Sequence, residues 1–325
     1  MQSASYICMV EGSKQRIIGR YEGQEKGPLY ICVGAMHGNE PAGVKAIEMV
    51  IKMLDVEPIR NPHFSFKGNV IGLIGNLQAY SQGKRYLDRD LNRSFDADLL
   101  KRLQVLPPQE LAGEDREFVE LDALIRKEIS AYAPDKVVFL DLHTTSSRGG
   151  VFTICRDKQE DIKIGSALHA PIVLGMLEGL KGTTLHYFVP EVLGVDVTPI
   201  TFESGQHEEK MSVNRAVAGL ICCMRAFGSV QPDVVENHHE RTLMTYCEPL
   251  PKVTELLKVH AITPADDFEM RQGYENFQPV SAGETVAVDK QGPITVAEDC
   301  RILMPLYQAQ GEDGFFLVKD IDRDL

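Results

Sequence analysis

The sequence predicts an α/β fold: a mixed, largely parallel sheet with helices on both faces, followed by a small, mostly β C-terminal domain. Two observations indicate the first part. Strand-like and helix-like segments alternate through the first 230 residues, and several strand-like segments are apolar throughout, as strands buried on both faces are. After Gly228, short β-like segments separated by Gly, Pro and Asp replace this alternation. We therefore expect one domain over 1–230 and another over 231–325.

The segments of the first domain follow one another in a clear order. The apolar run at 30–33 is typical of a buried strand. Positions 41–54 carry apolar residues at helical spacing, and Pro41 suits a first helical turn. The same criteria predict strands at 70–74, 137–142, 151–154 and 200–202, and helices at 118–131 and 213–227. In the second domain we expect strands at 286–288, 294–296, 302–304 and 315–318.

The composition is that of an ordinary globular protein, with 43% hydrophobic and 25% charged residues. A formal net charge of −13 argues against nucleic acid or an anionic membrane surface as the main partner. No uncharged apolar stretch approaches the ~18 residues of a transmembrane helix. The seven cysteines are scattered without a C-x-x-C pair, and the N-terminus does not resemble a signal peptide, so we expect a cytoplasmic protein. Nothing in the sequence fixes its oligomeric state.

Two histidines and a carboxylate follow strand-like segments that lie far apart in the chain. His37 and Glu40 stand three residues apart just after the first strand, and His143 ends a strand about a hundred residues later. Ligands of α/β proteins bind at the carboxyl ends of the strands, so these side chains can converge there. Two imidazoles and one carboxylate suit a zinc site with one position open for water. Alone, His37 and Glu40 are more simply a surface histidine and an exposed glutamate in a turn, but their combination with His143 is far more specific.

Asp141 belongs to the same strand end as His143. Side chains alternate along a strand, so Asp141 and His143 share a face of the sheet. Asp141 can therefore accept a hydrogen bond from the far nitrogen of a ligating histidine, which fixes the tautomer of that ring. The plainer alternative is an acid and a histidine in the polar mouth of a strand.

The charged segment 84–93 offers side chains that can grip a substrate. Charge-rich loops are most often only solvated. Arg85 and Arg93, however, provide planar forks that match a carboxylate, and Asn92 adds a neutral donor.

Glu203 ends a further apolar strand and is followed by Ser-Gly. A carboxylate in this position can act as a general base toward water and then protonate a leaving amine. The alternative is a carboxylate that caps a helix. We interpret His207 most simply as a surface histidine, and His169 has no partner at metal-ligand spacing.

Four segments in this order resemble the succinylglutamate desuccinylase/aspartoacylase family, a branch of the zinc carboxypeptidase-like superfamily. They are 34–40, Arg85 together with 90–93, 141–145 and 202–205. Residues 273–280 and 311–316 are also similar to that family's small β domain. The resemblance implies a zinc carboxypeptidase-like catalytic domain over 1–230, with one zinc ion per chain bound by His37, Glu40 and His143.

The resemblance also implies a role for each remaining candidate. Glu203 would be the catalytic base and acid. Arg85 would polarise the scissile carbonyl and stabilise its oxyanion. Asn92 and Arg93 would hold the α-carboxylate of the amino-acid half of the substrate.

We therefore expect a zinc-dependent amidohydrolase that removes the acyl group of an N-acyl amino acid. Cleavage of a short peptide at its carboxyl end, or of an ester, would use the same site. A non-catalytic zinc-binding or carboxylate-binding protein is disfavoured because every expected ligand and the base are present. Residues 192–197 contain no arginine and 308–311 no tyrosine, where aspartate-specific relatives supply such groups. This weakens N-acetylaspartate as the substrate and leaves uncharged or apolar acyl groups, or another amino acid, open.

Overall fold

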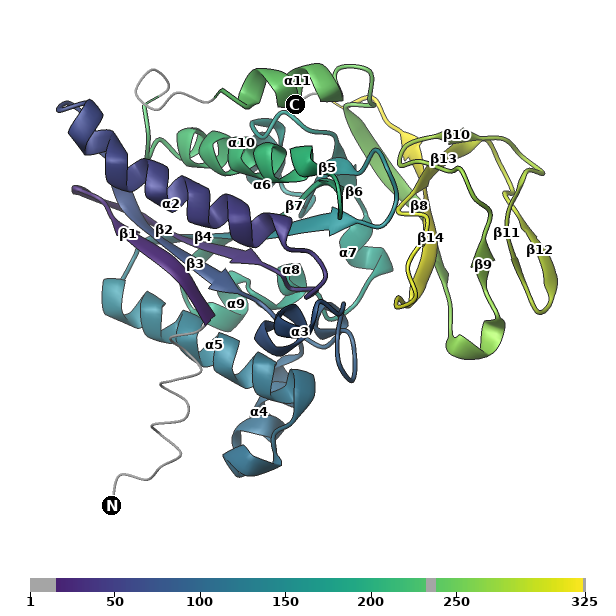
Figure 1. The fold of residues 1–325 in the computed structure, drawn as a ribbon, viewed down its shortest axis with the longest axis horizontal. Helices are drawn as coiled ribbons and strands as arrows, with labels where there is room; N and C mark the ends of the chain where they lie inside the picture. The colour runs from purple at the N-terminus through teal and green to yellow at the C-terminus, as the bar shows by residue number, and fades with distance from the viewer. Residues whose placement is uncertain (1–15, 232–237, 324–325) are drawn as a thin grey trace.

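The structure, a computed structural model, describes residues 16–231 and 238–323. The N-terminal residues compared with a signal peptide lie outside these ranges. The central element is an 11-stranded sheet in the order β1-β3-β2-β4-β7-β5-β6-β8-β14-β13-β10 (Figure 1). Its first seven strands in the sequence are β1 Ile17–Glu22, β2 Glu25–Gly34, β3 Lys67–Ile74, β4 Lys136–Thr145, β5 Val151–Cys155, β6 Ile172–Leu174 and β7 Asp196–Gln206.

The middle of this sheet is parallel, as the apolar runs predict. Strand β2 pairs in parallel with β3 and β4, and β4 pairs in parallel with β7. Strand β5 runs antiparallel to β7, so the sheet is mixed. The predicted fold class is confirmed.

Helices cover both faces of the sheet (Figure 1). On one face lie α2 (Ala42–Arg60) and α10 (Lys210–Ala226), which contact each other and share one hydrophobic cluster with the sheet. On the other face α5 (Gly113–Tyr132) packs in a second cluster. Helix α2 forms because its apolar residues recur at helical spacing and turn one face to the sheet. The buried ones include Val44, Ile47, Val50, Ile51 and Leu54.

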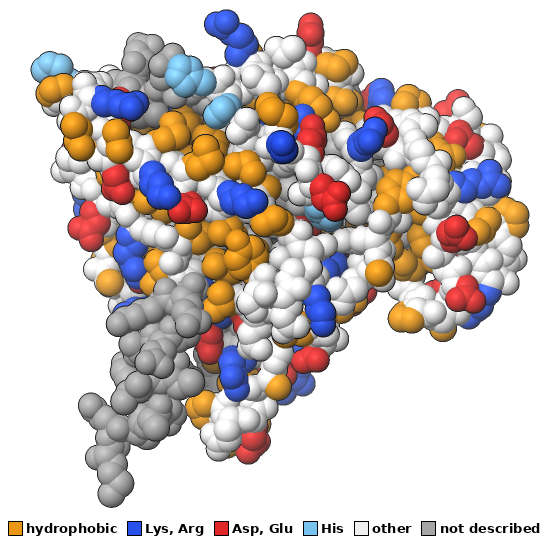
Figure 2. Space-filling model, in the orientation of Figure 1, with side chains coloured by type: hydrophobic (Ala, Val, Ile, Leu, Met, Phe, Trp, Pro, Cys, Tyr) orange, Lys and Arg blue, Asp and Glu red, His pale blue; other side chains and the backbone are white. Residues whose placement is uncertain are grey.

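Shorter helical elements connect the strands. They are α3 Leu77–Gln82, η1 Leu91–Arg93, α4 Ala97–Gln104, η2 Pro108–Glu110, α6 Gln159–Ser166, α7 Met176–Gly179, α8 Thr184–Tyr187, α9 Pro190–Leu193, α11 Glu240–Cys247 and η3 Pro264–Asp266. Of these, η1, α7 and α8 contribute side chains to the cavity described below. No helix in the described ranges combines the length and apolar character needed to span a lipid bilayer. Figure 2 shows Lys and Arg side chains interspersed with Asp and Glu over the visible face.

The C-terminal part is β-rich, as predicted. Four of its strands continue the main sheet: β8 Val253–Ala261, β14 Asp313–Asp320, β13 Cys300–Leu303 and β10 Pro279–Val280. A separate three-stranded sheet contains β9 Glu269–Met270, β11 Thr285–Asp289 and β12 Gly292–Thr295. Strand β8 pairs in parallel with β6, so hydrogen bonding runs across the expected domain boundary near residue 230, and that boundary stays a prediction.

Candidate metal centre and active site

The loop after β2 carries His37 and Glu40 to the carboxyl edge of the sheet. It leaves the strand through Ala35, whose φ of 53° is unusual for a residue with a side chain and marks a sharp turn. A Cβ on Gly38 would lie 2.2 Å from the backbone of Ala79 and Tyr80, so only glycine fits there. Close packing against α3 therefore sets the path of this loop.

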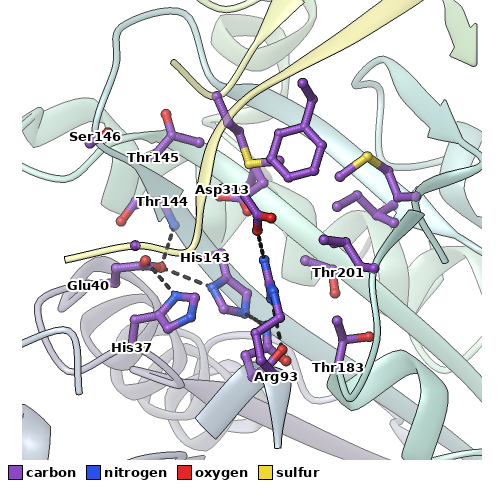
Figure 3. A pocket seen from close by; sticks show the side chains of 18 of the residues that line it. His37, Glu40, Arg93, His143, Thr144, Thr145, Ser146, Thr183, Thr201 and Asp313 are labelled. Carbon is purple, nitrogen blue, oxygen red and sulfur yellow. Dashed lines mark hydrogen bonds and ion pairs between the residues drawn. The ribbon is translucent and has the colours of Figure 1, made fainter. Parts of the chain in front are cut away.

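His37, Glu40 and His143 meet at one point (Figure 3). Their ligating atoms all lie within 4.8 Å of one another, and all three residues are buried. One oxygen of Glu40 lies 2.8 Å from Nδ1 of His37, and the other lies 3.0 Å from Nδ1 of His143. The backbone N–H of Thr144 also donates to Glu40, at 2.9 Å. The structure thus brings together the three residues expected to hold a metal.

The outer nitrogen of each histidine faces a second carboxylate. Nε2 of His37 lies 3.1 Å from Asp90, and Nε2 of His143 lies 3.0 Å from Asp141. The hydroxyl of Thr184 donates to Asp141 at 2.6 Å. Carboxylates behind ligating imidazoles are the usual support of a metal site. Asp141 was expected in this place, whereas Asp90 was given no role although it lies in the charged segment 84–93.

The buried acids and imidazoles of this group influence one another's charge. Burial favours the neutral form of Glu40, but His37 and His143 outweigh it and hold the pKa of Glu40 well below its usual range. Burial likewise opposes the charge on His143, yet Asp141 and Glu40 raise the pKa of that imidazole well above its usual value. Several buried acids around two imidazoles need either protons or a metal ion between them. Nitrogen and carboxylate donors in this number suit zinc.

Glu203 faces the same cavity from the neighbouring strand. It lies opposite His143 in the β4–β7 register, so both side chains point to the same face of the sheet. Burial raises the pKa of Glu203 to about 8, although the charge of His143 opposes this. Its Oε2 is buried and has no hydrogen-bond partner within residues 16–231 and 238–323. Such a carboxyl group can exchange a proton with a molecule in the cavity near neutral pH.

Arg85 lies beside the metal-ligand group. Its guanidinium is 3.0 Å from Asp90 and 3.6 Å from Glu40, and only 12% of the side chain is exposed. Burial opposes its charge, yet Asp90 and Glu40 raise the pKa of Arg85, so it stays cationic. Its buried Nε has no hydrogen-bond partner among the described residues.

The loop that carries Arg85 and Asp90 is held by Glu114. This buried carboxylate accepts the backbone N–H groups of Leu87, Asp88 and Arg89 at 2.7, 2.9 and 3.2 Å. Burial raises the pKa of Glu114, but these hydrogen bonds outweigh it and the pKa is lowered. Glu114 is therefore a positioning residue that was absent from the predicted site.

Asn92 and Arg93 also line the cavity and belong to η1. The amide of Asn92 accepts from the backbone N–H of Thr184 at 3.0 Å and lies 3.5 Å from Nε2 of His143. Arg93 donates to Asp313 of β14 at 2.7 Å. Asp313 comes from the C-terminal part of the chain and was not predicted.

His207 is not a surface histidine, which corrects the simplest interpretation of the sequence. It lines the cavity, and its Nδ1 lies 2.7 Å from the hydroxyl of Thr144. Its Nε2 lies 3.3 Å from the amide oxygen of Gln308. Burial lowers the pKa of His207 and so favours the neutral ring. Strand β7 extends to Gln206, past the predicted end at 202, and this carries His207 inward.

A second group of possible metal ligands lies on the helical face of the molecule. His169, Cys222 and Glu240 place ligand atoms within 4.8 Å of one another. No local pattern in the sequence indicated this group, because its members are distant in the chain. Glu240 also pairs with Arg225 at 2.6 Å, which neutralises its charge.

Fold and site together define a class: α/β proteins that present a buried His–Glu–His group and a facing carboxyl at the strand ends of a mixed sheet. Residues 26–219 match the model of the succinylglutamate desuccinylase/aspartoacylase catalytic domain. The chain belongs to this family of amide-bond deacylases, which confirms the resemblance noted from the motifs.

Individual relatives agree with this assignment. A probable aspartoacylase from one strain of Prochlorococcus marinus is 32% identical over 278 residues, which cover 81% of this chain and 84% of the relative. A second relative is the probable aspartoacylase of Prochlorococcus marinus strain MIT 9313. It is 30% identical over 153 residues, which cover 46% of this chain and 44% of the relative. The solved succinylglutamate desuccinylase of Chromobacterium violaceum has the same fold, with a TM-score of 0.60, 17% identity and 97% of both chains covered.

Proposed function

We propose that this protein is a zinc-dependent hydrolase that cleaves the amide bond of an N-acyl amino acid. One observation carries the proposal. The buried His37–Glu40–His143 group and the unpartnered oxygen of Glu203 border the same cavity. A metal-ligand set and a proton acceptor in one cavity are what metal-assisted hydrolysis requires.

His37, Glu40 and His143 would hold the zinc ion, with Asp90 and Asp141 fixing the two rings. When bound, zinc acts as a Lewis acid: it lowers the pKa of a coordinated water toward ~7 and polarises a carbonyl group. The donors fit this role because the two Nδ1 atoms and the carboxylate already face one another.

Glu203 takes a proton from the attacking water while the oxygen of that water bonds to the amide carbon. Arg85 donates to the carbonyl oxygen as negative charge develops there. The carbon–nitrogen bond then breaks, and Glu203 returns the proton to the departing nitrogen. The products are a carboxylic acid and a free amino acid, and Glu203 ends in its starting state.

Asn92 and Arg93 would hold the carboxylate of the amino-acid half. Both line the cavity, on the η1 element next to Asp90. One terminal nitrogen of Arg93 donates to Asp313 and the other to the backbone carbonyl of Asn92. A guanidinium has five N–H donors, so Arg93 can bind a substrate carboxylate without losing these bonds.

The direct test is release of free amine from N-acyl amino acids by protein stripped of metal and then reloaded with zinc. We expect hydrolysis with zinc and almost none without it. Peptides and esters of the same amino acids belong in the same experiment. Cleavage of dipeptides or esters, but not of N-acyl amino acids, would replace this proposal with carboxypeptidase or esterase action. No cleavage of any of them would indicate a binding protein.

A further inference from the structure

Resting on the proposed function, we propose that the substrate carries a single carboxylate and one apolar group, and that the protein discriminates against substrates with a second carboxylate. The proposal depends on the charge of the cavity and on its apolar wall. The relatives are named instead for acylated acidic amino acids, as aspartoacylase and succinylglutamate desuccinylase.

Charge around the cavity is the first argument. Two cationic side chains line it, Arg85 and Arg93. Four acidic side chains line it: Glu40, Glu203, Glu312 and Asp313. Two further acids, Asp90 and Asp141, stand directly behind the histidines. Even with Glu203 protonated, the five other acids outweigh two arginines and a bound divalent ion, so a second substrate carboxylate would find no uncompensated cation.

Both guanidinium groups are already engaged. Arg85 pairs with Asp90 at 3.0 Å, and Arg93 pairs with Asp313 at 2.7 Å. A second substrate carboxylate would therefore lie next to an acid that already balances the charge of the arginine. One substrate carboxylate can share Arg93, and Arg85 is assigned to the carbonyl oxygen, so no further Lys or Arg among the described residues that line the cavity remains for a second carboxylate.

The apolar wall is the second argument. Hydrophobic side chains from β5, α7 and the residue after it, α8, β14 and the segment after β13 line the cavity: Ile154, Met176, Leu177, Leu180, Leu185, Met304, Leu306 and Phe316. Most of them belong to the hydrophobic cluster between β5, α7 and β14. Leu177, Leu180 and Met304 are only partly buried, so they keep apolar surface free for a ligand.

This wall lies away from the metal-ligand group. In Figure 3 the carbon-only and sulfur-bearing side chains gather on the far side of Asp313 from His37 and Glu40. A substrate whose amide lies near Glu203 can therefore extend an apolar group past Arg93. Each methylene buried there should improve binding about fourfold.

The experiment measures binding and cleavage separately. Glu203→Gln protein loaded with zinc is titrated by calorimetry with N-acetyl-leucine, N-acetyl-phenylalanine, N-acetyl-aspartate, N-hexanoyl-glycine and N-succinyl-glycine. The wild-type protein is assayed for cleavage of the same compounds. We expect the monocarboxylates with apolar groups to bind at least about tenfold more tightly than the dicarboxylates. The leucine and hexanoyl arms distinguish an apolar amino acid from an apolar acyl group.

A charge placed on the wall tests its role. Leu180→Arg should narrow or reverse the preference, because it supplies a free cation and removes apolar surface. Val105→Arg adds the same charge on an exposed site 80% open to solvent and should change nothing. Tighter binding of dicarboxylates by the Glu203→Gln protein would overturn this inference, whatever the cleavage result. Absence of cleavage with the expected binding order would instead overturn the proposed function alone.

Discussion

Within residues 16–231 and 238–323, two groups bring the ligand atoms of three metal-ligating side chains within 4.8 Å of one another, and their surroundings differ. In the His37–Glu40–His143 group the shared carboxylate faces two imidazoles, and each ring is supported by an outer acid. In the His169–Cys222–Glu240 group the carboxylate is paired with Arg225. His169 and Glu240 are 35% and 26% exposed there, whereas the side chains of the first group are at most 6% exposed.

The comparison indicates that suitable ligand types, with ligand atoms close to one another, are not enough to define a metal site. Arg225 stands at hydrogen-bond distance from Glu240, 2.6 Å, and would repel a cation brought there. By contrast, Arg85 stands 3.6 Å from Glu40, beyond that distance. Outer carboxylates have the opposite effect to Arg225, because they orient the rings and increase the demand for positive charge. The first group also borders a cavity lined by Glu203, whose Oε2 has no hydrogen-bond partner among the described residues.

The largest effect should come from Glu203→Gln. This change keeps the shape of the side chain but removes its capacity to accept a proton. Turnover should fall on the order of 10²–10⁴-fold, with bound metal unchanged. The measurement pairs steady-state amine release with metal analysis of the same sample. Normal turnover in the variant would show that Glu203 is not the base. The first group would then lack one of the features that distinguish it from the second.

The outer acids should matter next. Asp141→Asn should weaken zinc binding about 10–100-fold, because His143 loses its charged partner. Competition titration against a chromophoric chelator measures this affinity. The control is Asp161→Asn, which removes another buried carboxylate that pairs with Arg156 away from the cavity. Equal losses in both variants would mean that Asp141 acts on stability in general.

Glu114→Gln should destabilise the loop that holds Arg85 and Asp90. An amide cannot accept all the N–H bonds that this carboxylate accepts, so the free energy of unfolding should fall by about 1–3 kcal/mol. Denaturant titration at pH 7 measures this change, and Glu110→Gln in the exposed η2 turn is the control. An unchanged free energy of unfolding would show that the hydrogen bonds to Glu114 do not contribute to stability.

The same carboxylate predicts a pH dependence. Its pKa is lowered in the folded protein, so its contribution to stability is present above the unfolded value of about 4.3. That contribution is lost as the pH falls through the lower folded pKa. The difference in stability between wild-type protein and Glu114→Gln should therefore shrink in acid. A difference that grows in acid would contradict this.

The smallest effect belongs to the second group. His169→Ala should leave turnover within about twofold and the bound metal unchanged, because Arg225 already balances Glu240. Steady-state assays and metal analysis check this outcome. Loss of a metal ion in this variant would show that the second group also binds metal, which would contradict the proposed difference between the two groups.

Much of the fold follows from local patterns. Continuous apolar runs predicted β2 and β4, and helical spacing predicted α2 and α10. Strand β8 was not among the predicted strands because Glu255 and Lys258 interrupt its apolar pattern. Its partners in the main sheet, β6 and β14, lie far away in the sequence.

The residues of the site also fall into those that the sequence predicted and those that it did not. His37, Glu40 and His143 stand at strand ends, so parallel pairing brings them together and the motifs could find them. Their supports could not be found so easily. Asp313 reaches Arg93 across 220 residues, and Glu114 reaches Leu87 from the first turn of α5. These contacts depend on how loops pack in three dimensions, which no short motif records.

The most direct measurement is the zinc content of purified protein by mass spectrometry. We expect one ion per chain in the wild-type protein and in His169→Ala, and none in Glu40→Gln after dialysis. One ion that persists without Glu40 but disappears with His169 would contradict the account.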